Sequence, residues 1–457
     1  MSTRTKRFIL PESEIPTQWY NIAADMPNKP MPPLNPADPR AAAASDLYPI
    51  FAKALADQEM NQTDAWIDIP EAVGSSTRTT VVRRWYGLTS WKKALGTPAH
   101  IYFKNESVSP VGSHKLNSAI AQAYFCKQEG ITNITTETGA GQWGAALSYA
   151  AKAFGLELAV YMVKISYEQK PYRRSIMQTF GAQVTASPSM STKAGRKILT
   201  DHPNYQGSLG TAISEAIELA MSTPNCKYTL GSVLSHVTLH QTIIGLEAEK
   251  QMAMAGEYPD IVIRLFRRRI EFRRHFVPVH AAQHPVGQKT RFIAAEPNSC
   301  PKLTRGVFRY DFGDEAGYTP LLPMFTLGHN FAPGQHPCRR TALPRGAGVI
   351  VSQLLKDKMM EAVDIAQLDS FEAGCLFAQT EGIIPLPNRA MRSRRPSTKL
   401  TNARRGGEQK VILFNLSGHG LIDVASYDKY IAGDLMNYTL TDEQIAENIK
   451  ELDTMKL

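Results

Sequence analysis

Hydrophobic and polar residues follow two different periods along most of this chain. Short apolar runs rich in β-branched residues, such as Ile131–Thr136, predict buried strands, and longer segments with apolar residues at helical spacing, such as Gly144–Phe154, predict helices. The pattern predicts strands at Ala99–Lys104, Ile131–Thr136, Leu158–Ile165, Ile261–Ile263, Arg291–Ala295 and Val411–Asn415, and helices at Ser113–Gln128, Gly144–Phe154, Gln169–Phe180, Gly210–Met221 and Leu234–Met252. Strands that alternate with helices of this length indicate an α/β fold with parallel sheets and right-handed crossovers.

The length of the chain and its hydrophobic content bound the domain organisation. The 457 residues, 43% of them hydrophobic, could form two α/β domains that share a cleft, or one large domain with extensions. We expect the two-domain arrangement, with twisted parallel sheets flanked by helices. The expected division is a Pro-rich N-terminal extension at residues 1–70, α/β domains at 71–255 and 256–435, and a C-terminal tail helix at 436–457.

Cysteine usage and the N-terminal segment predict a cytoplasmic protein. The five cysteines are an odd, scattered set without a Cys-x-x-Cys pair, so neither a disulfide framework nor a zinc site is expected, and no metal is predicted. The N-terminal segment lacks the apolar core of a signal peptide, and no later stretch approaches the length of a membrane span. We therefore expect neither secretion nor a membrane.

The formal charge of +9 comes from three short windows rather than from the whole chain. Six arginines lie in residues 264–274, three in 339–345 and six in 389–405, and subtracting these fifteen charges from +9 leaves −6. A basic chain can bind nucleic acid, but such sites usually interleave aromatic residues with the charges, and these windows do not. No nucleic-acid partner is expected.

Lys115 is the first candidate for chemistry, in the run Gly112-Ser113-His114-Lys115-Leu116-Asn117 at a predicted helix start. A lysine in this position is more often a solvated charge than a functional group. A Schiff-base lysine, however, must be partly desolvated, and small neighbours leave room for a flat cofactor ring. The run therefore favours a carbonyl cofactor bound at Lys115.

Two further motifs follow strand ends, where ligands bind in parallel sheets. Small residues at 138–142 precede a helix, and free backbone N–H groups there suit a carboxylate or phosphate, although a tight turn would have the same composition. Glu137 directly before them is a candidate for acid–base chemistry. Ser417, in Ser417-Gly418-His419-Gly420, could simply end a strand or could meet a pyridine nitrogen.

These motifs, in this order, resemble the β chain of tryptophan synthase, specifically its second, longer branch. The resemblance runs from about Leu95 to about Tyr430. The most specific matching strings are SPVGSHKLNSA (109–119), TTETGAGQWG (135–144), SYEQKPYRRS (166–175), HQTIIGLEAE (240–249), TEGIIP (380–385) and FNLSGHG (414–420).

The resemblance implies a pyridoxal-phosphate enzyme of fold type II that condenses L-serine with indole to L-tryptophan and water, with the cofactor in the interdomain cleft. It implies that Lys115 bonds to the cofactor and moves the serine α-proton, and that Glu137 helps to expel the serine hydroxyl and then steadies the indole nitrogen. It further places the cofactor phosphate near His114, the cofactor ring near Asn117 and Glu381, the ring nitrogen at Ser417, and the amino acid carboxylate at Thr138, Gly139, Ala140, Gly141 and Gln142. Trp143, where the first branch carries His, is typical of the second branch.

The resemblance also has implications for partners. It suggests a homodimer whose small-molecule substrates are L-serine and indole, with an α subunit as a further candidate partner. In this interpretation the domain at 71–255 carries the lysine and the carboxylate loop, and the domain at 256–435 carries the phosphate loop.

That phosphate loop departs from the family pattern. After the strand Ile261–Ile263 the family carries Gly-x-x-Gly-Gly-Gly-Ser-Asn, whereas this chain carries the arginines of 264–274. Arginine can pair with phosphate, but it cannot replace glycine where the backbone must approach the ligand closely. One set of codons for this window, read one nucleotide later, encodes Gly-Cys-Phe-Gly-Gly-Gly-Ser-Asn-Phe-Gly. We therefore hypothesise compensating frameshifts in the coding DNA, here and at residues 339–345 and 389–405.

Two alternative functions share several of these features. Another fold type II enzyme, one that eliminates the β-substituent of serine or threonine, would use the same lysine, but such enzymes usually bind the carboxylate with a Ser/Thr-rich loop. A catalytically inactive relative would keep the fold and, with arginines at 264–274, would hold the cofactor weakly. Product analysis with and without indole, and cofactor binding, distinguish these interpretations.

Overall fold

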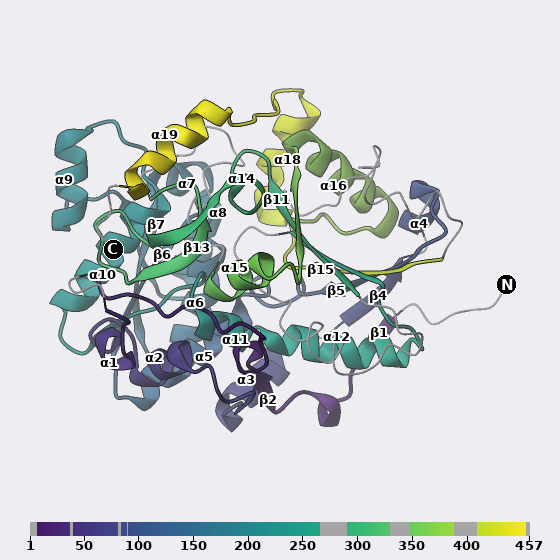
Figure 1. Ribbon diagram of the computed structural model, residues 1–457, viewed down its shortest axis with the longest axis horizontal. Coiled ribbons are helices and arrows are strands. Elements are labelled where there is room, and N and C mark those ends of the chain that lie inside the picture. Colours follow the sequence, from purple (N-terminus) through teal and green to yellow (C-terminus); the bar gives the residue numbers. More distant parts are fainter. Residues whose placement is uncertain are drawn as a thin grey trace.

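A computed structural model of the protein describes residues 7–36, 40–80, 84–88, 90–265, 290–329, 348–387 and 409–453. The arginine windows at 339–345 and 389–405, and residues 266–274 of the first window, lie outside the described residues. The predicted α/β class is confirmed: two sheets occupy opposite halves of the molecule, and helices surround both (Figure 1).

The larger sheet is mostly parallel, with an antiparallel edge. Neighbouring strands from β5 to β14 pair in parallel, whereas β1 and β4 run antiparallel at one side. Its strand order is β1 (Arg7–Ile9), β4 (Arg84–Leu88), β5 (His100–Asn105), β15 (Val411–Leu416), β10 (Ile261–Leu265), β11 (Arg291–Pro297) and β14 (Glu361–Ile365).

The smaller sheet is fully parallel, in the order β8 (Gln183–Ser187), β7 (Glu157–Val163), β6 (Asn133–Thr138) and β9 (Cys226–Tyr228). Successive residues of a strand point to opposite faces. Val160 and Met162 of β7 accordingly join the apolar cluster formed with α5 (Leu116–Gln128), α6 (Gln142–Ala153) and α8 (Pro171–Thr179). Tyr161 and Val163 join the cluster formed with α10 (Leu209–Ser222) on the other face.

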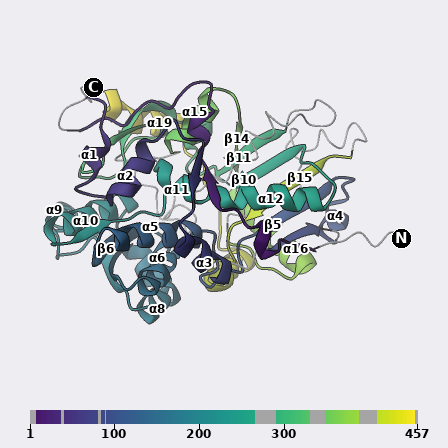
Figure 2. The same cartoon turned by 90° about the horizontal axis from the view of Figure 1, so that it is seen from below.

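The remaining elements connect and cover the two sheets (Figure 2). They are the strands β2 (Gln18–Tyr20), β3 (Trp66–Asp68), β12 (Val307–Phe312) and β13 (Leu321–Thr326), the helices α1 (Ala44–Leu47), α2 (Lys53–Met60), α3 (Glu71–Thr80), α4 (Ser90–Leu95), α7 (Lys164–Gln169), α9 (Lys193–Asp201), α11 (Ser235–His240), α12 (Thr242–Met254), α14 (Lys302–Arg305), α15 (Val349–Lys356), α16 (Gln367–Glu381), α18 (Val424–Ile431) and α19 (Asp442–Asp453), and the 3-10 turns η1 (Glu12–Glu14), η2 (Ile22–Ala24) and η3 (Leu421–Asp423).

The N-terminal segment packs into the body of the protein. Strand β2 pairs with β3, and the Trp19 side chain between them is 1% exposed. Trp19 joins the core cluster that contains α5 and α6, and its ring lies 4.6 Å from that of His240 in α11. Burial of such large aromatic surface contributes about 2 to 3 kcal/mol to stability. The predicted extension therefore forms part of the core.

One predicted helix begins later than expected, and another is divided. The segment predicted as Gln169–Phe180 forms α8, which begins at Pro171 because proline has no backbone N–H and suits the first position of a helix; Gln169 is the last residue of α7. The segment predicted as Leu234–Met252 forms α11 and α12, with the division at Gln241. Helix α5 begins at Leu116 rather than near Ser113, because Ser113 forms a β-bridge with Gly418 instead.

The larger sheet contains strands from both sides of the predicted domain boundary near residue 255. Strands β4 and β5 precede this boundary, yet they lie in the larger sheet, where β5 pairs with β15 in the register Phe103 to Phe414. The chain thus contributes its first strands to the sheet that its second half completes. No helix among the described residues has the length and apolarity that a membrane crossing requires.

Candidate active site

Lys115 lies buried at the start of α5, beyond the carboxyl end of β5. Its side chain is one of the buried charged groups, at 3% exposed, so it is not the solvated lysine that its position alone would favour. Its Nζ donates a hydrogen bond to the carbonyl oxygen of Gly231 at 2.8 Å and lies 5.7 Å from the centre of the Trp143 ring.

The segment before Lys115 is held against the segment that follows β15. His114 donates from its backbone N and from Nδ1 to the carbonyl oxygen of Ser417, at 3.1 and 2.9 Å. Gly112 has φ +64°, and a Cβ there would lie 2.0 Å from Nε2 of His419, so only glycine allows this approach. The structure thus brings the predicted residues His114, Lys115 and Ser417 together from opposite ends of the chain.

Glu137 lies at the end of β6 and is 1% exposed. The hydroxyl of Tyr228 on the neighbouring strand β9 donates to its Oε2 at 2.5 Å. A buried carboxyl group that accepts a short hydrogen bond is suited to proton transfer. Sequence reasoning found Glu137 but missed Tyr228, because nothing around Cys226–Tyr228 predicted a strand.

The predicted carboxylate loop is the turn between β6 and α6. Gly141 is the N-cap of α6 with φ +87° and has no side chain to cap the helix. Thr138 Oγ1 accepts from the backbone N of Gly144 at 3.3 Å, and the first turn of a helix leaves further N–H groups for an anion. A Cβ on Gly141 would lie 2.7 Å from Cβ of Arg173, which leaves no room for a side chain. Gln142 then begins the helix, and its Nε2 would lie 3.1 Å from a Cβ placed on Gly418.

Arg173 and Asp423 form a buried ion pair beside this loop, which sequence reasoning did not identify. Arg173 donates from Nη2 to Asp423 Oδ2 at 3.0 Å, and Lys170 donates to Oδ1 at 2.5 Å. Burial alone would raise the pKa of Asp423, but Lys170 and Arg173 lower that pKa to about 2. Burial, and then the charge of Arg173, lower the pKa of His419, although the Asp423 carboxylate opposes this shift.

Of the remaining predicted site residues, Asn117 lies beside His114, whereas the Glu381 carboxylate lies at the start of α4. Asn117 donates from Nδ2 to the carbonyl oxygen of His114 at 3.0 Å and to Glu106 Oε2 at 3.3 Å. Glu381 is the last residue of α16, and its carboxylate accepts the backbone N–H of Trp91 at 2.7 Å. The chain after Glu381 returns to the site, since Pro385 forms a β-bridge with His419.

Unpartnered polar atoms show that this region can hold a polar, planar group. Among the described residues, Ser113 Oγ, Asn117 Oδ1 and both amide atoms of Asn415 are buried without a hydrogen-bond partner. Such atoms are costly unless a ligand or water satisfies them. Ser113 forms a β-bridge with Gly418, Asn117 bonds to the carbonyl oxygen of His114, and Asn415 lies near the end of β15. These residues fit a cofactor ring bound at the carboxyl ends of β5 and β15.

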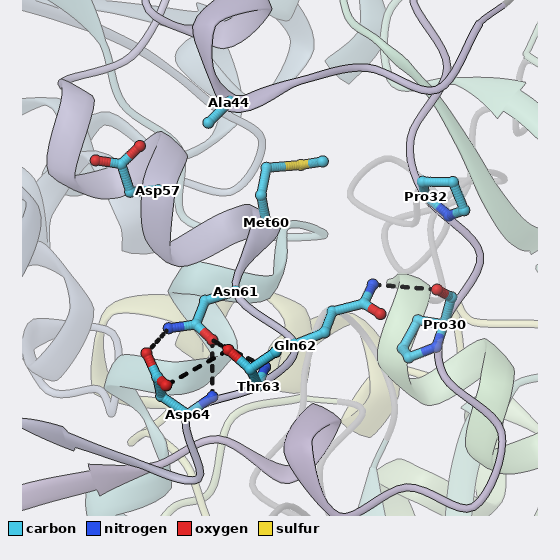
Figure 3. A pocket seen from close by; sticks show the side chains of 9 residues that line it. All are labelled: Pro30, Pro32, Ala44, Asp57, Met60, Asn61, Gln62, Thr63 and Asp64. Atoms are coloured by element: carbon cyan, nitrogen blue, oxygen red, sulfur yellow. Dashed lines mark hydrogen bonds between the residues drawn. The ribbon is translucent and has the colours of Figure 1, made fainter.

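A surface hollow of about 610 Å³ lies elsewhere, in the N-terminal segment (Figure 3). Its polar walls are bonded to one another: Gln62 donates to the carbonyl oxygen of Pro30 at 3.1 Å, and Asn61 donates to Asp64 at 2.9 Å. It contains none of the predicted catalytic residues. Its lining residues are Pro30, Pro32, Ala44, Asp57, Met60, Asn61, Gln62, Thr63 and Asp64.

Comparison with known proteins agrees with this geometry. A family model described as "Pyridoxal-phosphate dependent enzyme" matches residues 78–265. The chain is 47% identical over 438 residues to "Tryptophan synthase beta chain 2" of Aquifex aeolicus, covering 94% of this chain and 99% of that one. It is 48% identical over 438 residues to the protein of the same name from Methanosarcina mazei, covering 94% and 97%.

Two solved structures share the fold at low sequence identity. A fungal L-serine ammonia-lyase from Rhizomucor miehei has a TM-score of 0.54 at 15% identity, over 77% of this chain and 98% of that one. An O-ureido-L-serine synthase has a TM-score of 0.52 at 17% identity, over 85% of this chain and 100% of that one. The architecture is therefore that of fold type II pyridoxal-phosphate enzymes.

Proposed function

Because the chain belongs to the tryptophan synthase β chain family, we propose that it condenses L-serine with indole to give L-tryptophan and water. Its cofactor is pyridoxal phosphate. One observation carries the proposal: residues 228–231, at the end of β9 and just after it, contact both candidate catalytic groups. Tyr228 bonds to Glu137, and the carbonyl oxygen of Gly231 accepts from Lys115. The Lys115 amine and the Glu137 carboxyl group are thus held by the same short segment, as two proton transfers on one substrate require.

Each predicted residue has a role in this reaction. Pyridoxal phosphate, which Lys115 would hold until serine takes the place of the lysine, would supply an electron sink for charge that develops at the serine α-carbon. The Lys115 Nζ takes the α-proton and returns it at the end. Glu137 would protonate the departing serine hydroxyl, which leaves as water. Its carboxylate would then accept a hydrogen bond from the indole N–H while the new carbon–carbon bond forms, and would take up the proton that indole loses, which restores the acid.

The other predicted residues bind rather than transfer protons. The backbone N–H groups of residues 138–142 hold the serine carboxylate at the start of α6, where the helix dipole favours a negative charge. The Ser417 hydroxyl meets the cofactor ring nitrogen, and His114 lies near the phosphate. Asn117 and Glu381 lie near the ring, which the free Oδ1 of Asn117 supports.

We also infer a cytoplasmic homodimer with the cofactor between the two sheets. The family resemblance supports the dimer. The position of the cofactor is supported by the segments from both sheets that meet at His114 and Lys115. Analytical ultracentrifugation of the purified protein tests the dimer. Adding a purified α subunit from the same source tests whether a larger complex forms.

Product analysis with and without indole tests the reaction itself. Incubation of the purified protein with L-serine, indole and pyridoxal phosphate should yield tryptophan, and Lys115→Met should abolish it. Pyruvate and ammonia formed equally well without indole would instead identify a β-elimination enzyme. Cofactor binding without either product would identify an inactive relative.

A further inference from the structure

The Trp143 ring lies next to the candidate cofactor lysine, and a hydrogen bond to Thr136 holds it in place. Its side chain is 1% exposed, and its indole Nε1 donates to Thr136 Oγ1 at 2.6 Å. The Thr136 hydroxyl is also buried and donates in turn to the carbonyl oxygen of Thr229 at 2.5 Å. A hydroxyl has one proton to donate, so these two bonds fix its orientation and the plane of the indole ring.

The same ring packs face-on against the chain segment that holds Lys115. A Cβ on Gly231 would lie 2.2 Å from Cδ2 of Trp143, so the glycine backbone rests directly on the ring. The Lys115 Nζ bonds to the Gly231 carbonyl oxygen and lies 5.7 Å from the ring centre. Trp143 therefore supports both the lysine and the lysine's hydrogen-bond acceptor.

The segment 229–231 is anchored from its other side as well. Gln122 of α5 donates to the carbonyl oxygen of Leu230 at 2.8 Å and accepts from the Leu230 N–H at 3.2 Å. Thr229 N donates to the carbonyl oxygen of Thr135 at 2.9 Å. These bonds hold residues 229 and 230, whereas Gly231 itself packs against the Trp143 ring.

We propose that Trp143, oriented by Thr136, is a positioning residue for Lys115: its ring face and the Gly231 carbonyl define where the Lys115 nitrogen lies when it bonds to the cofactor and when it transfers protons. The inference rests on the proposed role of Lys115 as the cofactor lysine. An aromatic face favours a protonated nitrogen without itself titrating, so the ring supports the charged form across the working pH range. A lysine on four rotatable bonds gains the most from such support, since its own stem fixes little.

The test uses the purified full-length protein loaded with pyridoxal phosphate. Thr136→Val removes the hydroxyl that accepts from the Trp143 N–H, and Thr136→Ser retains it. Trp143→Phe retains an aromatic ring without the N–H, and Trp143→Leu removes the ring. Trp19→Phe is the matched control, because Trp19 is equally buried in the same apolar cluster but packs against His240. The readouts are the pH midpoint of the bound cofactor's visible absorbance, the dissociation constant of the cofactor, and the unfolding temperature.

Trp143→Leu should lower the absorbance midpoint by roughly half a pH unit, because the protonated nitrogen loses the aromatic face. Thr136→Val should weaken cofactor binding about five- to tenfold, as loss of one buried hydrogen bond does. Thr136→Ser and Trp19→Phe should match the wild type in both readouts.

A wild-type midpoint in Trp143→Leu and a wild-type cofactor affinity in Thr136→Val, accompanied only by lower unfolding temperatures, would reduce Trp143 to a core residue and overturn the proposal. These readouts do not depend on turnover. A wild-type protein that shows the cofactor absorbance but makes no tryptophan would count against the proposed function, and the positioning of Lys115 would still be measurable.

Discussion

Arg173 donates from Nη2 to Asp423 Oδ2 at 3.0 Å, and this ion pair joins the helix beside Gly141 to the segment after Ser417. Both side chains are almost fully buried, and the Arg173 stem lies against the predicted carboxylate loop. The pair thus ties the loop from one sheet to the predicted ring-nitrogen segment from the other.

Removing the carboxylate should strongly destabilise the protein. Asp423→Asn leaves the charge of Arg173 buried without a counter-charge, which costs about 3 to 5 kcal/mol. The free energy of unfolding, measured by urea titration, should fall by this amount at neutral pH. Glu447→Gln at the exposed pair with Lys450 is the control and should leave that free energy unchanged.

The same pair predicts an acid transition. The pKa of Asp423 is lowered from 3.8 to about 2, so its contribution is complete above the ordinary value and is lost as the pH falls through this window. Wild-type stability should therefore drop between about pH 4 and about pH 2. A drop of equal size in Asp423→Asn would show that other carboxylates cause it.

Glu296 should give a pH dependence of the opposite sign. Burial raises its pKa from 4.5 to about 7, although the nearby Lys302 and hydrogen bonds from Leu303 and Thr304 oppose the shift. Between these values the folded protein retains a proton that the unfolded chain has lost, so stability decreases as the pH rises, by on the order of 3 kcal/mol. Urea titrations from about pH 4 to about pH 8 should show this slope. A slope of equal size in Glu296→Gln would contradict the assignment.

Gly141→Ala should disable the carboxylate loop. Its φ of +87° and the 2.7 Å approach to Arg173 leave no room for a methyl group, so the loop must shift. Displacement of a binding group by about 1 Å can cost about a hundredfold, and we expect a loss of that size in kcat/KM for serine. Gly130→Ala is the matched control, since Gly130 has φ +72° but no neighbour within 4 Å. The Gly130→Ala protein should be less stable, with unchanged kcat/KM. An equal loss of kcat/KM in Gly130→Ala would contradict the explanation by close packing at Gly141.

Glu137→Gln should separate chemistry from cofactor binding. Loss of an acid–base group typically reduces the rate about a hundred- to ten-thousand-fold. We expect that loss in kcat for tryptophan formation while the cofactor absorbance persists. Tyr228→Phe should cause a smaller loss, because it removes only the hydrogen bond to Glu137.

Tyr205→Phe is the control for that second variant, since its hydroxyl bonds to Glu315 at 3.2 Å in another part of the fold. Full activity in Glu137→Gln would remove this carboxylate from the mechanism. Equal losses in the two tyrosine variants would indicate a general effect on stability.

Independent sequencing of the coding DNA across the arginine windows, read against the intact protein mass, tests the frameshift hypothesis. We expect the glycine loop to replace residues 264–274, with a protein mass to match. If the arginines are present in both DNA and protein, the hypothesis is wrong. Weak cofactor binding would then follow, because arginine cannot reproduce the close backbone approach of glycine.

The sequence by itself determined the α/β class, most of the central strands and helices, and the candidates Lys115, Glu137 and Ser417. These features are local: hydrophobic period is read within one element, and each candidate lies in a short string beside its own strand end. Tertiary structure decided the strand order that places β5 beside β15, and the break of the predicted helix at Gln241. It also decided the partners of the site residues, namely Tyr228 on Glu137, Gly231 and Trp143 around Lys115, and Asp423 on Arg173. These contacts join segments far apart in the chain, and their geometry depends on how two sheets pack, which no local pattern encodes.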